Sequence, residues 1–172
     1  PHRISEYIHQ KYGHLNCIDI GANIGDTIAS FYKKDTDTFL AIEPNPKFNK
    51  LLSENWGWNT NITVVSDICS SGSDEGEFVI QEKNGTASIL QTNSGIKMRK
   101  RSLDEIVSDH PFAANANVLK IDTDGHDFEI IEGSRGLRSR NLPVVLFECD
   151  AFENANYVQD CMRTLGRFKE SG

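Results

Sequence analysis

The stretch Cys17–Thr27, which reads CIDIGANIGDT, decides the fold of this chain. It begins as an apolar strand, passes the acidic residue Asp19, and enters a turn that contains Gly21 and Gly25. Glycine lets the backbone turn tightly and approach a ligand without a Cβ in the way, and a helix that starts after such a turn offers unpaired N–H groups. A strand, a glycine turn and a helix in this order predict a nucleotide-type cofactor site.

The spacing of the turn distinguishes two kinds of cofactor. Dinucleotide sites have the pattern Gly-x-Gly-x-x-Gly, which Asn23 and Ile24 interrupt. The turn is similar instead to the Asp-x-Gly-x-x-x-Gly turn of S-adenosylmethionine-dependent methyltransferases. A carboxylate at Asp19 would repel a pyrophosphate and attract the ammonium and sulfonium charges of S-adenosylmethionine. The alternative is an ordinary transition from strand to turn between Asp19 and Gly21.

Two further acids follow predicted strands. The strand Thr38–Ile42 ends at Glu43, and in open α/β sheets an acid about 20 residues past the glycine turn commonly accepts hydrogen bonds from ribose hydroxyls. The loop Val64–Cys69 contains Asp67, at a position where methyltransferases often keep a carboxylate for the adenine amino group. Asp67 could equally cap a turn.

The composition points to one domain and excludes several partners. The chain has 172 residues, of which 38% are hydrophobic, so we expect a single domain over residues 1–172. Its longest apolar runs are strand-sized and no signal segment opens it, so we expect a cytoplasmic protein with no membrane partner. A net charge of −7 argues against nucleic acid as a partner. The basic cluster Lys97–Arg101 is a local exception: either a solvated loop or a receptor for an anionic substrate group such as a phosphate or carboxylate.

Short apolar runs alternate with amphipathic segments, which is typical of a parallel sheet covered by helices. We expect helices at residues 4–12, 26–34, 46–56 and 154–165, a capping box that starts a helix at 102–105, and central strands at 118–122 and 143–148. Asn84 and Gly85 form a favoured hairpin turn between the runs Gly76–Gln81 and Thr86–Leu90. This inserted β-hairpin and the polar loop Gln91–Arg101 would project near the carboxyl ends of the strands, where substrates bind.

A second group of ionisable residues lies in Lys120–Glu129, which reads KIDTDGHDFE. Asp122 ends the predicted strand and would face the cofactor, while His126 could remove a proton from a hydroxyl near neutral pH. Methyl transfer requires mainly alignment of donor and acceptor and removal of the acceptor's proton. The alternative is that His126 is a partly exposed residue at a helix start. Glu148, at the end of the next strand, is predicted to face the same cleft, where it could bind substrate hydroxyls or serve as the base.

In their order these motifs resemble the FkbM-type methyltransferases over about Asn16–Asp150. The segments that carry the resemblance are Ile18–Gly25, Glu43–Pro46, Ser102–Asp104, Lys120–Asp122 with Gly125, and Pro143–Glu148. The resemblance implies an α/β fold of the class I, Rossmann-like type, with a mostly parallel sheet between two layers of helices. It also implies S-adenosyl-L-methionine as the methyl donor and O-methylation of hydroxyls on sugars, polysaccharides or natural products.

The chain departs from this family in two places. The family usually reads Asp-Val-Glu-Gly-Ala-Glu where Asp122–Asp127 reads DTDGHD, which leaves the identity of the acceptor open. The chain also ends at Gly172, whereas the fold normally adds two further strands. If those strands are missing, one sheet edge is unpaired, and we expect a homodimer or reduced stability.

The leading hypothesis is an S-adenosylmethionine-dependent O-methyltransferase with a small-molecule or glycan acceptor. Its predicted cofactor-binding residues are Asp19, Gly21, Asn23, Gly25, Glu43 and Asp67, and its predicted catalytic residues are Asp122, His126 and Glu148. We predict no metal centre, although Asp122, Asp124 and Asp150 could supply oxygen ligands in a metal-dependent variant. Two other classes stay open: a non-catalytic module that binds the cofactor, and a nicotinamide-dependent oxidoreductase.

Overall fold

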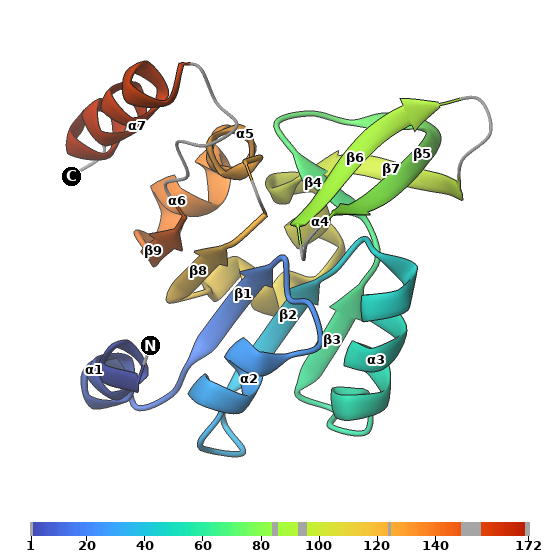
Figure 1. Ribbon diagram of the computed structural model, residues 1–172. Coiled ribbons are helices and arrows are strands. Elements are labelled where there is room, and N and C mark those ends of the chain that lie inside the picture. The colour runs from blue at the N-terminus through green and yellow to red at the C-terminus, as the bar shows by residue number, and fades with distance from the viewer. Residues whose placement is uncertain (1, 84–85, 93–95, 124, 149–155, 171–172) are drawn as a thin grey trace.

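The structure is a computed structural model that describes residues 2–83, 86–92, 96–123, 125–148 and 156–170. Its centre is a parallel five-stranded sheet with the strand order β3-β2-β1-β8-β9 (Figure 1). The strands are β1 (Asn16–Ile20), β2 (Thr38–Ile42), β3 (Ile62–Val65), β8 (Val118–Ile121) and β9 (Val144–Phe147). The four predicted strands β1, β2, β8 and β9 are therefore present, and all five strands pair in parallel register. Strand β3 includes Val64 and Val65, which were expected in a loop.

Helices cover both faces of this sheet. Residues of α1 (His2–Tyr12), α2 (Asp26–Phe31) and α3 (Pro46–Trp56) pack with Cys17 and Phe39 on one face. The opposite face, which includes Ile18 and Leu40, packs against α4 (Leu103–Asp109), the 3-10 helix η1 (Pro111–Asn115), α5 (Asp127–Glu132) and α6 (Arg135–Asn141). Alternate residues of one strand point to opposite faces, so a strand that is apolar at every position has two helical layers.

A second sheet has the order β4-β7-β5-β6 and lies beyond the carboxyl ends of β1 and β2 (Figure 1). Its strands are β4 (Ile68–Ser70), β5 (Asp74–Lys83), β6 (Thr86–Thr92) and β7 (Ile96–Ser102). The antiparallel pair β5 and β6 confirms the predicted hairpin, whose turn residues 84–85 lie outside the described residues.

The predicted polar loop Gln91–Arg101 is wrong, because residues 96–102 form strand β7. Strand β7 pairs antiparallel with β5 and parallel with β4. Met98 is buried against Ile68 and Phe78. The high charge of this segment led to the loop prediction. The segment forms a strand because it pairs with β4 and β5, and such tertiary context can outweigh local composition.

Helix ends agree with prediction where a local cap specifies them. Ser102 and Glu105 form the predicted capping box at the start of α4. Helix α2 was expected to reach Lys34 but ends at Phe31, since the backbone N–H groups of Lys33 and Lys34 donate to the Asp37 carboxylate instead.

The last helix differs more from prediction. Helix α7 (Tyr157–Glu170) runs through Gly166, where we expected it to stop; the predicted start at Asn154 lies outside the described residues. Beyond Gly166, Phe168 contacts Phe147 and the Arg138 guanidinium, and these contacts extend the helix. Val158 and Leu165 were expected in the core but are exposed.

In the described part of the chain, no helix is long and apolar enough to cross a membrane.

Candidate functional site

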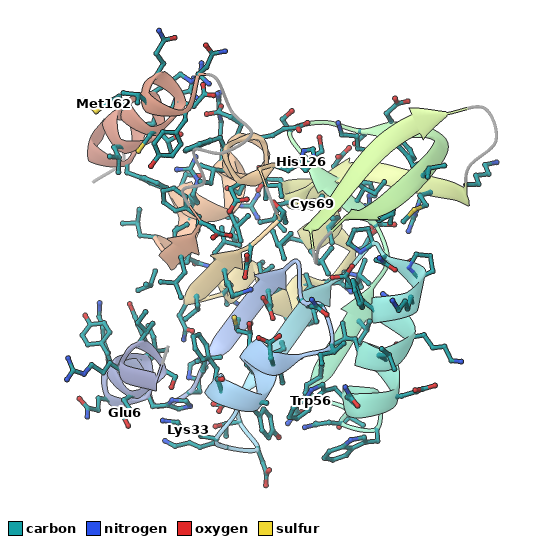
Figure 2. All side chains as sticks on the ribbon, in the orientation of Figure 1. Glu6, Lys33, Trp56, Cys69, His126 and Met162 are labelled. Atoms are coloured by element: carbon teal, nitrogen blue, oxygen red, sulfur yellow. The ribbon has the colours of Figure 1, made fainter. Side chains whose placement is uncertain are left out.

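A cavity of about 230 Å³ lies between the carboxyl ends of the central strands and the second sheet. The main sheet contributes the turn after β1, the loop after β2 and the segment after β8, including Asp122 and His126. The second sheet contributes Phe78 from β5, Lys100 from β7 and Cys69 from β4. Figure 2 shows Cys69 and His126 near each other at this level of the molecule. The carboxyl edge of a parallel sheet is where open α/β folds bind ligands.

The turn after β1 requires glycine. Gly21 has φ 75°, and a Cβ there would lie 1.9 Å from the carbonyl oxygen of Asp122. Gly25 has φ 94°, and a Cβ there would lie 2.4 Å from the Trp56 ring. Asn23 also adopts the left-handed region, with φ 49°. The backbone therefore passes close to two neighbouring elements, and of these residues Gly21 and Asn23 line the cavity while Gly25 does not.

Glu43 lies at the edge of the cavity and is only 6% exposed. Its two carboxylate oxygens accept hydrogen bonds of 2.8 Å from the backbone N–H groups of Asn23 and Asn45. Burial raises the pKa of Glu43, while those two N–H groups and the charge of Lys120 oppose the rise. A carboxylate has about four lone-pair positions, so Glu43 keeps acceptor capacity for a ligand.

Asp19 is fully buried and does not line the cavity. Its Oδ1 lies 3.1 Å from Lys120 Nζ, and its Oδ2 has no hydrogen-bond partner among the described residues. Burial raises the pKa of Asp19 to about 6, with Lys120 opposing the rise. The cation beside Asp19 is thus Lys120, which also lies 3.2 Å from Asp122, the acid that reaches the cavity.

Asp67 lies outside the cavity and lines a neighbouring groove. Its carboxylate, 5% exposed, accepts from the guanidinium groups of Arg99 and Arg101, with Nη–Oδ distances of 3.1 Å to each. The structure therefore places Asp67 in a double ion pair beside the cavity, and its contact with the adenine amino group stays a prediction.

His126 belongs to a network of polar side chains on the cavity wall. Its Nδ1 lies 3.6 Å from Oε2 of Glu129. Glu129 also accepts a hydrogen bond from Ser70 and pairs with Lys100 Nζ at 3.1 Å. The contact with His126 holds the pKa of Glu129 well below its usual range, and Ser70 and Lys100 add to this effect against burial.

The predicted site residues did not include Glu129 or Lys100, although both line the cavity. Lys100 was considered only as part of the basic cluster Lys97–Arg101, as one of several candidates to receive an anionic group. The signal for Glu129 was its position three residues after His126 at a helix start, where side chains meet on one face. The signal for Lys100 was its place between Arg99 and Arg101: in a strand, its side chain points to the opposite face from theirs. The segment was assigned to a loop, so this difference was not considered.

Glu148 was expected in one cleft with Asp122 and His126. It lines a second cavity of about 410 Å³, to which Asp122 and Lys120 contribute and His126 does not. The backbone N–H of Glu148 donates to Oδ1 of Asp127, whose Oδ2 accepts from the Thr123 hydroxyl. Asp127 thereby joins the ends of β8 and β9, and Asp122 alone of the predicted catalytic residues lines both cavities.

Among the residues that the structure describes, the His, Cys, Asp and Glu side chains form no group of three or more that could hold a metal ion. Asp124 and Asp150, considered as oxygen ligands, lie outside the described residues. Of the four cysteines, Cys17 and Cys69 are buried and form no disulfide, Cys161 is half-buried, and Cys149 lies outside the described residues.

Comparison with known proteins agrees with this geometry. Residues 19–169 match the family described as "Methyltransferase FkbM domain". The chain belongs to the FkbM methyltransferase family. Membership favours a methyltransferase over the nicotinamide-dependent oxidoreductase that the turn left open.

One curated relative is the hexuronic acid methyltransferase AglP of Haloferax volcanii. It is 30% identical over 132 residues, which are 74% of this chain and 53% of AglP. The chain thus spans about half the length of that relative.

Two solved structures are similar to this FkbM-family chain. The methyltransferase FkbM of Methylobacillus flagellatus superposes with a TM-score of 0.61 at 16% identity, covering 94% of this chain and 44% of that one. An S-adenosylmethionine-dependent O-methyltransferase of Thermotoga maritima gives a TM-score of 0.51 at 16% identity, covering 96% and 49%. At this identity the likeness concerns the fold, and it confirms the predicted class I methyltransferase architecture.

Proposed function

We propose that this chain is an S-adenosyl-L-methionine-dependent O-methyltransferase that acts on a hydroxyl of a sugar or glycan. The observation that carries the proposal is the Glu43 carboxylate, which is held at the cavity edge by two backbone N–H groups and retains acceptor capacity. Family membership supplies the cofactor class, and the cavity provides the residues to hold it.

The residues around the cavity fit S-adenosylmethionine in three parts. Glu43 would accept hydrogen bonds from the ribose hydroxyls. Phe48, Ile68 and Cys69 give the cavity an apolar wall that suits a flat aromatic base. Asp122 offers a carboxylate to the ammonium group of the cofactor, with its position set by Lys120. Since Asp19 and Asp67 do not line the cavity, we assign them supporting contacts rather than direct ones.

When bound, the cofactor supplies a methyl group on a positively charged sulfur that an oxygen nucleophile can displace. The contribution of the protein is to align the acceptor and to receive its proton. Nδ1 of His126 faces Glu129, so Nε2 is the nitrogen that we assign to the acceptor hydroxyl. Glu129 would orient the ring and balance the positive charge that His126 gains.

The acceptor class rests on the relative AglP, whose name describes a hexuronic acid methyltransferase. We extend from it only the chemical class, a sugar-containing acceptor. The pair of His126 and Glu129 favours catalysis over the alternative of a module that only binds the cofactor, because an imidazole oriented by a carboxylate on the cavity wall is suited to receive a proton from a hydroxyl.

The test has two stages. The purified chain is first titrated calorimetrically with S-adenosylhomocysteine, with NADH as the control ligand. It is then incubated with methyl-labelled S-adenosylmethionine and a panel of neutral and acidic oligosaccharides. Saturable binding of S-adenosylhomocysteine alone, followed by label in an oligosaccharide, is the expected result. Binding of NADH in its place contradicts the cofactor, and binding without transfer to any acceptor supports the non-catalytic module.

A further inference from the structure

A groove of about 600 Å³ lies beside the cofactor cavity, between α3 and strand β7. Pro44 lines both the groove and the cavity, so the two spaces are neighbours at the end of β2. Strand β7 divides its basic residues between them: Lys97 and Arg99 line the groove, whereas Lys100 lines the cavity. This division follows from the alternation of side chains along a strand.

Cations dominate the charge of the groove. Lys50, Lys97 and Arg99 line it, and its single carboxylate is Asp67. Asp67 pairs with Arg99 and also with Arg101, and Arg101 pairs with Asp109 as well. Lys50 lies 3.8 Å from Glu54, which does not line the groove. Because three cations and one carboxylate line the groove, a local positive charge remains, although the whole chain carries a net charge of −7. A basic site on an acidic protein attracts anionic ligands selectively, because the rest of the surface repels them.

The contact with Asp67 also holds Arg99 in position. The Asp67 side chain is 5% exposed and Arg99 is 58% exposed, so the buried carboxylate anchors one edge of the guanidinium while the rest faces solvent. A guanidinium held in this way is suited to a planar carboxylate, which it binds through two parallel hydrogen bonds. The groove also includes Pro44, Pro46 and Met98, whose apolar surfaces suit the C–H face of a sugar ring.

We propose that this groove binds carboxylate-bearing sugar units of an acidic glycan, next to the unit whose hydroxyl is methylated in the cavity. The proposal rests on the proposed function for the position of the methylated unit. Lys50 and Lys97 contribute charge on the two sides of the groove, and Arg99 contributes the oriented contact. The acceptor is then a polymer or oligomer of acidic sugars rather than a neutral glycan.

The experiment titrates the whole chain, saturated with S-adenosylhomocysteine, with an oligogalacturonate and with a neutral malto-oligosaccharide of equal length. The variant Lys50→Gln/Lys97→Gln removes two exposed charges from the groove. Its matched control, Lys33→Gln/Lys34→Gln, removes two exposed charges at the opposite end of the main sheet, where Figure 2 shows Lys33 far from His126. Affinity for S-adenosylhomocysteine is measured for all three proteins.

We expect the oligogalacturonate to bind the unmodified chain and the control variant with equal affinity, within about twofold, and the groove variant about tenfold more weakly. Affinity for S-adenosylhomocysteine should be the same in all three proteins, which separates this result from failure of the proposed function. Equal binding of the neutral oligosaccharide, or an unchanged oligogalacturonate affinity in the groove variant, overturns the proposal. Tighter binding of a sulfated or phosphorylated oligosaccharide would overturn the assignment to carboxylates.

Discussion

The backbone N–H of Asn23 donates a hydrogen bond of 2.8 Å to Oε2 of Glu43. This bond joins the turn after β1 to the acid at the end of β2, and it lies on the wall of the cavity. Because Asn23 is in a left-handed conformation, the bond depends on the shape of the whole turn. The glycine residues and the acid, predicted separately from the sequence, therefore form one unit, and substitutions in either should affect ligand binding.

Replacement of Gly21 by alanine should damage this unit most. The added Cβ would lie 1.9 Å from the Asp122 carbonyl oxygen at a residue with φ 75°, so the backbone must move. We expect loss of at least about 2 kcal/mol in the free energy of unfolding and weaker binding of S-adenosylhomocysteine. Urea denaturation and calorimetry measure the two effects. Gly72→Ala is the control because a Cβ there contacts nothing within 4 Å; equal effects in both variants would contradict the argument.

Replacement of Glu43 by alanine should weaken cofactor binding with less effect on folding. Hydrogen bonds to a charged acceptor contribute about 1.5 to 3 kcal/mol, which corresponds to a loss of about ten- to hundredfold in affinity for S-adenosylhomocysteine. Calorimetric titration measures this loss. Glu54→Ala, at an exposed position of α3, should bind as the unmodified chain does. An unchanged affinity in Glu43→Ala would remove Glu43 from the site.

Elements that depend on neighbouring residues were predictable from the sequence. The turn at Gly21, the acid Glu43 at a strand end, the hairpin of β5 and β6, and the capping box at Ser102 each have a local chemical cause. Each of these causes involves residues that are close together in the sequence, so the sequence pattern alone is enough to recognise it. These elements were enough to indicate the fold class and the edge of the sheet where the cavity lies.

Contacts between distant residues were not predictable in this way. Lys120 lies 101 positions from Asp19, and the two arginines that pair with Asp67 are more than 30 positions from it. The cationic partners of both acids are therefore visible only after folding, and the sequence pattern contained no sign of these ion pairs. Strand β7 was assigned to a loop for the same reason, since the burial of Met98 depends on pairing with β4 and β5.

The stability of the amino-terminal part should depend on pH through Asp37. This buried carboxylate accepts hydrogen bonds from His9 and from the backbone N–H groups of Leu15, Lys33 and Lys34. Burial opposes its ionisation, but these donors hold the pKa of Asp37 below its usual value. A lowered pKa in the folded state stabilises the protein above the unfolded-state pKa, and this stability is lost as the pH falls through the folded-state value.

Asp37→Asn should therefore lower the free energy of unfolding by about 2 kcal/mol at pH 7, and the difference from the unmodified chain should shrink toward pH 3. Urea denaturation across this pH range provides the measurement. Asp35→Asn, two residues away and exposed, should match the unmodified chain at both pH values. A difference between Asp37→Asn and the unmodified chain that is constant with pH would show that packing, not ionisation, is the cause.

The paired side chains of His126 and Glu129 should control the rate of methyl transfer and not cofactor affinity. His126→Ala is expected to lower kcat by about 10²- to 10⁴-fold, the usual contribution of a general base, while S-adenosylhomocysteine affinity stays the same. Glu129→Gln removes a negative charge 3.6 Å from Nδ1 and leaves the other charged groups of the cavity in place, which are Glu43, Asp74, Lys100 and Asp122.

Loss of that negative charge leaves the His126 ring without the carboxylate that orients it, so we expect Glu129→Gln to lower kcat by about tenfold and to leave S-adenosylhomocysteine affinity the same. Initial rates with a saturating acceptor from the oligosaccharide screen measure the loss. His14→Ala, at an exposed histidine outside the cavity, should keep the full rate. If His126→Ala kept its full rate, the base would have to be another cavity residue, and Asp122 would be the first to test, because it alone lines both cavities among the predicted catalytic residues.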